Sequence, residues 1–538
     1  VTDEANGYDL TLNAGTGGAV MGSAAEGAGA VTLADLTLAN AVSASFNGHL
    51  QVNELVTTAN AYALTLKGSA NTFAVAIDFR SSGKLTLGTA SGDDFFFNGG
   101  LASSGNTAMD LAGNFRSSGN AFDFGTGAVT LRADTSVDTT NNGGSVTGGD
   151  IAFGGTIDNE GAAAIRKKLT LDAGTIGTVA IGGTVGGNHG IGTFSVAAGS
   201  QVDLAAIEDA ATIAVNADNI DLNAATYTAS SGPLTLSGDV DLDLAGDTVA
   251  LTTVDEALTV TGTIDDDTAG DSALTLTTGS GSVDLQGAVG GGTSLGTFTV
   301  ASASAADLAD VAGSSLSVTA DTIDLNASDY TATAGGIRFA GAVDLAAGAV
   351  PTTVDSSVGG GAIVFTSTID DAVGNTALTL DAGTGTVTAG GTVGSMGGLG
   401  GFTVAAASQA DLAAIEDAST IAVTADNIDL NAATYTASSG PLTLSGDVDL
   451  DFAGGTVALT TVDEALTVTG TIDDDTAGDS ALTLTTGSGS VDLQGAVGGG
   501  TALGTFKVAS ASAADLAEVT ASSLSVTADT IGLNDTAY

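Results

Sequence analysis

The sequence predicts an all-β solenoid, a parallel β-helix built from repeats of about 104 residues. Two observations support this fold class. Residues 203–330 and 411–538 align without a gap at an offset of 208 residues and are nearly identical. Short apolar–polar alternations separated by Gly-rich corners fill each repeat, and no stretch has the 3.6-residue period of a helix. Such a fixed period is typical of stacked, quasi-one-dimensional folds.

Each repeat contains short strands joined by tight corners. In residues 273–289, Leu274 and Leu276 alternate with Thr, a Gly/Ser turn follows, and Val283 and Leu285 continue the alternation. A period of two predicts strands with one apolar face and one polar face. One strand–turn–strand–turn unit of roughly 20 residues would form one turn of the β-helix.

The alternative fold is a string of immunoglobulin-like β-sandwiches of about 100 residues each. Such sandwiches usually contain a Trp or another large aromatic residue in the core, and Pro often marks their linkers. The chain has no Trp and only 3 Pro. Its composition therefore favours the β-helix over tandem immunoglobulin-like sandwiches.

The repeat period predicts five sections in the chain. Similar tetrads around Phe194, Phe298, Phe402 and Phe506 mark successive repeats. The sections are 1–156, a less regular β-helical part with a Phe-rich insert, followed by the repeats 157–263, 264–368 and 369–471 and the partial repeat 472–538. Because the sequence begins and ends within this pattern, we expect a processed or partial piece of a longer protein.

The charge of the chain limits its partners. The 538 residues include 62 acidic and 10 basic side chains, for a net charge of −52. Such a surface repels nucleic acid and anionic membranes, so we expect no nucleic-acid partner. It attracts divalent cations and cationic partners, although solubility alone also explains it. The chain has no Cys and no apolar run of transmembrane length, which predicts neither disulfides nor a membrane span.

An acidic corner recurs in the repeats and is a candidate calcium site. The residues are Asp265, Asp266, Asp267 and Asp271, and in the second copy Asp473, Asp474, Asp475 and Asp479. Calcium prefers several oxygen ligands from a flexible loop, and the segment DDDTAGD offers carboxylates and backbone carbonyls. The alternative is a solvated turn. We predict weak calcium binding that stiffens the solenoid, and no other cofactor.

The Phe-rich insert is a candidate partner-binding region. The pentapeptide FRSSG occurs at residues 79–83 and 115–119, and about half of the 17 Phe precede residue 125. The candidate contact residues are Phe79, Arg80, Phe95, Phe96, Phe97, Phe115 and Arg116. Their partner would be a glycan or a protein on a host or neighbouring cell. The insert is alternatively a wider section of the same stack.

The sequence predicts that the chain is not an enzyme. Asp239, Asp241 and Asp243 form a carboxylate stripe along one strand, which resembles the patch that some pectin-cleaving β-helices use. Those enzymes also need Lys or Arg to stabilise developing negative charge, and only Arg338 and Lys507 follow residue 168. A polysaccharide-active β-helix enzyme is the less favoured alternative.

The repeat also resembles a known family. The pattern ALTL-x-x-G-x-G-x-V followed by L-G-x-F-x-V spans residues 273–300 and 481–508. It resembles the repeat of giant bacterial β-strand-repeat proteins, which are similar to the filamentous haemagglutinin-like adhesins. The resemblance covers roughly residues 150–538. It implies a right-handed β-helical shaft, secreted by a type V route to the bacterial cell surface, with roles in adhesion and biofilm formation.

Together these patterns predict an extracellular structural or adhesive shaft of a large bacterial surface protein. The end turns of a β-helix have unpaired strand edges, which invite association. We therefore expect the end turns either to continue into more of the same chain or to dock end-to-end on another copy and form a filament.

Overall fold

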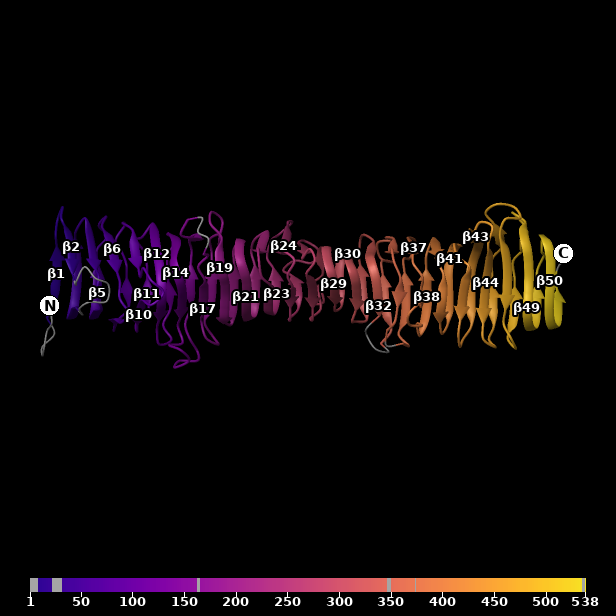
Figure 1. The fold of residues 1–538 in the computed structure, drawn as a ribbon, viewed down its shortest axis with the longest axis horizontal. Helices are drawn as coiled ribbons and strands as arrows, with labels where there is room; N and C mark the ends of the chain where they lie inside the picture. Colours follow the sequence, from indigo (N-terminus) through magenta and orange to yellow (C-terminus); the bar gives the residue numbers. More distant parts are fainter. Residues whose placement is uncertain (1–7, 22–30, 162–164, 346–349, 373, 535–537) are drawn as a thin grey trace. The chain divides into compact units, whose positions relative to one another are not determined.

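The computed structural model describes residues 8–21, 31–161, 165–345, 350–372, 374–534 and 538. These residues form 50 β-strands and no helix (Figure 1). The chain divides into two compact units, Val1–Asp267 and Thr268–Tyr538. No helix long and apolar enough to cross a membrane is found in the described part of the chain.

The first unit contains short strands that follow one another at tight corners. Its strands are β1 (Leu10–Asn13), β2 (Gly18–Met21), β3 (Val31–Asn40), β4 (Ser43–Phe46), β5 (Leu50–Thr57), β6 (Ala63–Leu66), β7 (Asn71–Phe73), β8 (Ile77–Asp78), β9 (Leu85–Leu87), β10 (Asp94–Phe97), β11 (Leu101–Ala102), β12 (Ala108–Arg116), β13 (Phe122–Asp123), β14 (Ala128–Asp138), β15 (Ile151–Phe153), β16 (Ile157–Asn159), β17 (Leu169–Asp172), β18 (Thr178–Ile181), β19 (Ile191–Ala198), β20 (Gln201–Leu204), β21 (Ile207–Leu222), β22 (Thr226–Ala229), β23 (Leu234–Leu242), β24 (Thr248–Thr253), β25 (Leu258–Val260) and β26 (Ile264–Asp266).

The second unit repeats many of these elements with the same sequences. Its strands are β27 (Ala273–Thr277), β28 (Ser282–Leu285), β29 (Leu295–Leu308), β30 (Val311–Leu325), β31 (Asp329–Ala332), β32 (Ile337–Leu345), β33 (Thr352–Asp355), β34 (Ile363–Phe365), β35 (Ile369–Asp370), β36 (Ala377–Asp381), β37 (Thr386–Ala389), β38 (Gly401–Ala406), β39 (Gln409–Leu412), β40 (Ile415–Ala418), β41 (Ile421–Leu430), β42 (Thr434–Ala437), β43 (Leu442–Leu450), β44 (Thr456–Thr461), β45 (Leu466–Val468), β46 (Ile472–Asp474), β47 (Ala481–Thr485), β48 (Ser490–Leu493), β49 (Leu503–Leu516) and β50 (Ala521–Leu533).

The strands pair in parallel with strands one turn further along the chain. In the first unit β17 pairs with β19, β19 with β21, and β21 with β23. In the second unit β29 pairs with β30, and β30 with β32. Within each unit the described strands thus stack as a β-solenoid, which fits a right-handed parallel β-helix and confirms the predicted fold. The immunoglobulin-like alternative is wrong, because sandwiches are built from antiparallel strands and every described pairing of named strands is parallel.

Alternation along each strand explains which side chains form the core. In β23 the buried residues are Leu234, Leu236, Val240 and Leu242, and Gly238 occupies the alternating position between the two pairs. Gly238 has φ +142°, and a Cβ at this position would overlap the carbonyl oxygen of Ala217. Glycine therefore allows one strand to turn a corner and return its apolar side chains to the core. β43 has the same sequence and the same burial pattern.

Stacked Phe rings form the core of the first unit between β7 and β15. Phe73 stacks on Phe97 with centroids 4.7 Å apart, and Phe95 stacks on Phe115 at 5.1 Å. Phe124 and Phe153 repeat this geometry at 4.3 Å. These rings are adjacent because the parallel register places them one turn apart at inward positions.

A buried Tyr recurs at one corner of the repeats. The hydroxyl groups of Tyr227, Tyr330 and Tyr435 donate to the carbonyl oxygens of Leu204, Leu308 and Leu412, at 2.7, 2.9 and 2.8 Å. Each hydroxyl also accepts a backbone N–H from three residues earlier in the chain. Burial raises the pKa of these Tyr side chains. They therefore act as neutral links between successive turns.

Candidate functional site

The most distinctive surface feature of the first unit lies over β10, β12 and β14. The register aligns Asp94 with Asn114 and Ser136 in one column, because each pairs with its neighbour across the parallel strands. Phe96, Arg116 and Asp138 form the next column. The intervening residues are buried, so both columns occupy outward positions.

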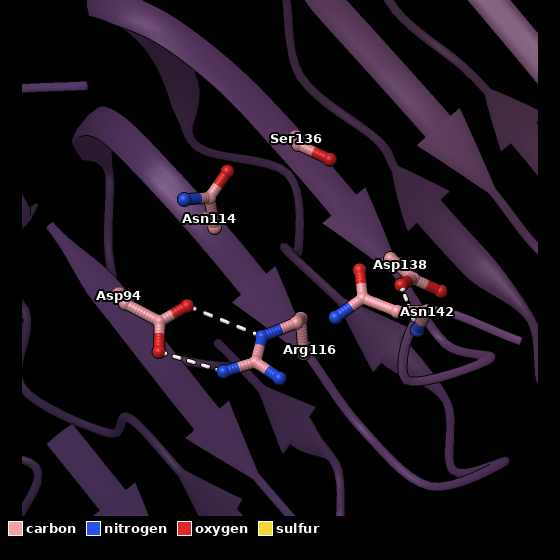
Figure 2. A pocket seen from close by; sticks show the side chains of 6 residues that line it. All are labelled: Asp94, Asn114, Arg116, Ser136, Asp138 and Asn142. Atoms are coloured by element: carbon pink, nitrogen blue, oxygen red, sulfur yellow. Dashed lines mark hydrogen bonds and ion pairs between the residues drawn. The ribbon is translucent and has the colours of Figure 1, made fainter. Parts of the chain in front are cut away.

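Two adjoining hollows follow these columns, and together we call them the Arg116 groove. The first has a volume of about 350 Å³ and is drawn in Figure 2. Its lining residues are Asp94, Asn114, Arg116, Ser136, Asp138 and Asn142. The second has a volume of about 320 Å³. Its lining residues are Ala70, Asn71, Thr72, Asp94, Phe96, Arg116 and Asn141. Asp94 and Arg116 belong to both hollows.

Arg116 is held in the middle of the groove by fixed partners. Its Nε and Nη2 atoms donate to the two carboxylate oxygens of Asp94, at 3.1 and 2.7 Å (Figure 2). Its Nη1 donates to Asn141 Oδ1 at 3.1 Å, and its guanidinium carbon lies 5.7 Å from the centroid of the Phe96 ring. The hydrogen bonds to Asp94 raise the pKa of Arg116. A bidentate pair of this kind fixes the guanidinium plane.

The segment between β14 and β15 forms one wall of the groove. Asp138 Oδ1 accepts hydrogen bonds from the backbone N–H and the hydroxyl of Thr140, at 2.7 and 2.6 Å. Asp138 Oδ2 accepts the backbone N–H of Asn142 at 2.6 Å. Asn141 and Asn142 have φ of 54° and 56°, a left-handed conformation that Asn tolerates better than most residues. The Asp138 carboxylate thereby fixes both Asn residues at the groove.

The groove offers mainly polar groups in a fixed array. Asn114 and Ser136 present side chains that make no hydrogen bond to the described residues (Figure 2). Arg116 balances the charge of Asp94, and Phe96 adds a partly exposed aromatic ring. Amide, hydroxyl and carboxylate groups can each make several hydrogen bonds. This array can therefore bind a polar ligand that also has an apolar face.

The structure separates the predicted partner-binding residues into two groups. Phe79, Phe95, Phe97 and Phe115 are fully buried, so the prediction that these four rings contact a partner is corrected. The physical reason is the period of two, which points alternate residues of a strand inward, where the Phe rings stack on one another. The insert is thus a Phe-rich section of the same stack.

The other three predicted residues lie at the surface. Phe96 and Arg116 line the groove. Arg80 is exposed and pairs with Asp78 at 2.9 Å, and it does not line either hollow.

Most of the groove residues are not among the candidates that the sequence predicts. The residues outside that prediction are Asp94, Asn114, Ser136, Asp138, Asn141 and Asn142. A signal was present in the tripeptides DFF (94–96), NFR (114–116) and SVD (136–138), each an apolar residue between two outward ones. Their spacing of roughly one turn would have placed them in register.

The candidate calcium residues of the first copy lie in different environments. Asp265 and Asp266 end β26, and Asp266 is only 3% exposed. Asp267 is exposed, and Asp271, also exposed, belongs to the second unit.

In the second copy, the acidic corner organises turns within the second unit. Asp473 Oδ1 accepts the backbone N–H groups of Gly500 and Thr501, at 2.8 and 2.9 Å. Asp474 is 2% exposed, and its Oδ2 accepts two backbone N–H groups, from Asp479 and Ser480, both at 2.9 Å. These bonds are those of a carboxylate-stabilised turn.

A small hollow of about 30 Å³ adjoins this turn. It is lined by Leu450, Asp451, Ala453, Asp474, Asp475, Thr476, Asp479 and Ser480. The Oδ1 atom of Asp474 is buried and has no hydrogen-bond partner among the described residues. No group of three or more His, Cys, Asp or Glu arranged to hold a metal ion occurs among the described residues. Calcium binding stays a prediction that a titration must test.

Aspartates also stack into ladders across the repeats. In the first unit the parallel register aligns Asp203, Asp221, Asp241 and Asp265. In the second unit one ladder comprises Asp284, Asp307, Asp324, Asp344 and Asp370, and another comprises Asp411, Asp429, Asp449 and Asp473. Neighbouring strands are about 4.8 Å apart, so like charges lie close together.

The ladders change the acidity of their central members. Burial, followed by hydrogen bonding and repulsion from the preceding Asp of the ladder, raises the pKa of Asp221, Asp324 and Asp429 to about 6 in each case. Gln409 partly offsets the repulsion in the last ladder, because its Nε2 donates to both Asp411 and Asp429, at 2.8 and 2.5 Å. These carboxyls therefore retain protons at a pH where isolated Asp side chains are ionised.

Comparison of the chain with known proteins finds no matching family model, no similar curated protein and no similar solved structure.

Proposed function

We propose that this chain is a non-enzymatic section of an extracellular shaft in a bacterial surface protein of the filamentous haemagglutinin-like type. One observation carries the proposal. The strands β23 and β43 have the same sequence and burial pattern, and each pairs in parallel with a preceding and a following turn of its own unit. Duplicating such a segment lengthens a solenoid without changing how its turns interact.

Stacked backbone hydrogen bonds and a continuous apolar core suit a load-bearing role. The acidic outer surface suits a role that requires many copies to remain apart in solution. The charged side chains of the repeats are almost all Asp and Glu, which also argues against chemistry that requires a cation at the reacting centre.

The last strand of the second unit suggests how such a shaft continues. Leu524, Ile531 and Leu533 of β50 are 42%, 48% and 58% exposed. Their equivalents in the preceding copy of the repeat, on β30, are buried beneath β32. The edge of β50 opposite β49, together with these inward side chains, therefore has the pattern of a turn that accepts one more turn, either from further chain or from a second copy.

Two experiments test the proposal. Immunogold labelling of intact cells of the source organism, with antibodies against the purified chain, should decorate the cell surface. Labelling that appears only after lysis would contradict an extracellular shaft.

Electron microscopy of the purified chain should reveal end-to-end fibres if a second copy covers β50. Ile531→Lys should abolish those fibres, whereas Ser525→Lys, at an outward position of the same strand, should leave them intact.

A further inference from the structure

We infer that the Arg116 groove binds a neutral oligosaccharide. Ligand binding by the isolated chain can be measured without reference to the proposed shaft function, so the two proposals are tested independently. It rests on the size of the groove, the free polar groups in it, its aromatic ring and its charge balance.

The groove has the dimensions of a ligand site. Each of its two hollows, of about 350 and 320 Å³, lies at the lower end of the range for binding pockets. The hollows share Asp94 and Arg116, so the groove continues past the ion pair from Thr72 on β7 to Ser136 on β14. A ligand along this line crosses several turns of the solenoid, and an extended glycan presents its sugar rings at a similarly regular spacing.

The unpaired polar side chains of the groove can make hydrogen bonds to the hydroxyl groups at the edge of a sugar ring. Asn114 and Ser136 have unused donors and acceptors, and Asn142 lines the same hollow from the wall (Figure 2). The Asp94 carboxylate, fixed by Arg116, has acceptor capacity beyond its two bonds to that side chain. Planar amide and carboxylate groups can bond two neighbouring hydroxyls at once.

Phe96 supplies the apolar part of the site. Its ring lies at an outward position of β10 and is partly exposed, in contrast to the buried Phe95 and Phe97 on either side. A pyranose ring has one face of C–H groups that can pack on such a ring, as apolar groups do on aromatic faces. The guanidinium of Arg116 lies over the ring, 5.7 Å from its centroid, so a sugar would pack on the part of the ring that remains exposed.

The charge distribution favours a neutral ligand. The guanidinium of Arg116 is already paired with Asp94, and the second carboxylate, Asp138, also lines the groove. Two carboxylates and one guanidinium in a chain of net charge −52 disfavour phosphate, sulfate or uronate groups. A protein ligand would instead be anchored by large apolar side chains, and this groove offers Phe96 and Ala70 as its only apolar lining residues.

Isothermal titration calorimetry on the full chain tests the inference. The probes are neutral hexasaccharides of β-1,4-linked glucose, mannose and xylose and of α-1,4-linked glucose, with hexagalacturonate as the anionic comparator. At least one neutral probe should bind, with a Kd of roughly micromolar to millimolar magnitude. Phe96→Ala should weaken that binding about tenfold or more.

Two further variants locate the site without threatening the fold. Asn142→Gly removes the amide while keeping a residue that adopts positive φ, and it should weaken binding about threefold or more. Arg338→Ala removes an exposed outward Arg of β32 in the second unit, and it should leave binding unchanged. Circular dichroism melting curves establish that each variant is folded.

Three outcomes would overturn the inference. The first is that no neutral probe binds at millimolar concentration, which leaves a protein ligand as the alternative for this groove. The second is that Phe96→Ala and Asn142→Gly both bind as tightly as the unmodified chain. The third is that hexagalacturonate binds more tightly than every neutral probe.

Discussion

The turns formed by residues 71–153 and the turns formed by the repeats 203–330 and 411–534 share one backbone architecture but differ in what their columns contain. In the first region, Phe rings stack inside and oppositely charged side chains pair outside. In the repeats, the core consists mainly of Ala, Val, Leu and Ile, and Asp stacks on Asp outside. Parallel pairing of the backbone gives both regions the same fold, whereas the side chains that stack in register differ between them.

This difference has a physical origin in how similar neighbouring turns are. In a parallel stack, each residue contacts the residue in register one turn away. Neighbouring turns of the repeats carry similar strands, such as residues 202–204 (VDL), 220–222 (IDL) and 240–242 (VDL), so like lies on like, which is favourable for Leu and unfavourable for Asp. The less regular turns escape this constraint, so Asp94 can lie beside Arg116 and a groove can form. We therefore expect a binding site in the less regular turns of residues 71–153, and we expect the repeats to serve as a structural scaffold.

The largest expected effect concerns the Phe column. Phe97→Ala should reduce the free energy of unfolding by about 3–5 kcal/mol, because Phe97 is fully buried between Phe73, Phe95 and Phe122. Urea unfolding followed by circular dichroism measures the loss. Phe452→Leu is the matched control, because Phe452 is partly exposed and Leu244 occupies the equivalent position in the other copy. A loss below about 1 kcal/mol for Phe97→Ala would contradict a tightly packed Phe column.

The second prediction concerns the ion pairs of the same region. Asp110 is 4% exposed, and its carboxylate contacts Lys84 Nζ at 2.8 Å and Arg132 Nε at 2.9 Å. Asp110→Ala should cost about 2 kcal/mol, because it leaves two cations without their shared partner. Arg80→Ala, which removes an exposed pair, should cost less than about 0.5 kcal/mol in the same urea experiment. Equal losses of unfolding free energy in the two variants would mean that burial of the Asp110 carboxylate does not add to the stability of the fold.

The third prediction concerns how the stability of the chain depends on pH, an effect that we expect from the Asp ladders of the repeats. The folded-state pKa of Asp221, Asp324 and Asp429 is about 6, above the unfolded value of about 3.9. The folded chain therefore binds more protons between these values, and stability falls as pH rises through this window. After allowance for solvent screening, each ladder should lose about 1 kcal/mol between pH 4 and pH 7.

Melting temperatures recorded at pH 5 and pH 7.5 test this prediction. The melting temperature should be higher at pH 5. The triple variant D221N/D324N/D429N should remove most of the difference and be more stable than the unmodified chain at pH 7.5. Asp123→Asn is the control, because its register neighbours are Ala102 and Ala152 and not carboxylates. A melting temperature that rises with pH would refute the ladder effect.

The smallest expected effect concerns calcium at the corner around Asp474. Millimolar calcium should raise the melting temperature by about 2 °C, because the buried Oδ1 of Asp474 adjoins a small hollow lined by three further carboxylates. Asp474→Asn should abolish the increase, and magnesium, which gives up its water ligands reluctantly, should produce a smaller one. An unchanged melting temperature with calcium would mean that these carboxylates serve only as turn acceptors.

The sequence by itself determined the fold class of this protein, because a period of two within strands and a fixed period between repeats leave few other ways to bury Leu, Val and Ile. It also identified Phe96 and Arg116 as residues of interest. It could not distinguish Phe96 from Phe95 and Phe97, since the inward phase of a strand depends on the neighbouring turns. Nor could it place Asp94 beside Arg116, or Asp203 beside Asp221. The tertiary structure alone decided these contacts, because the register between turns sets which residues meet across a separation of about 20 residues.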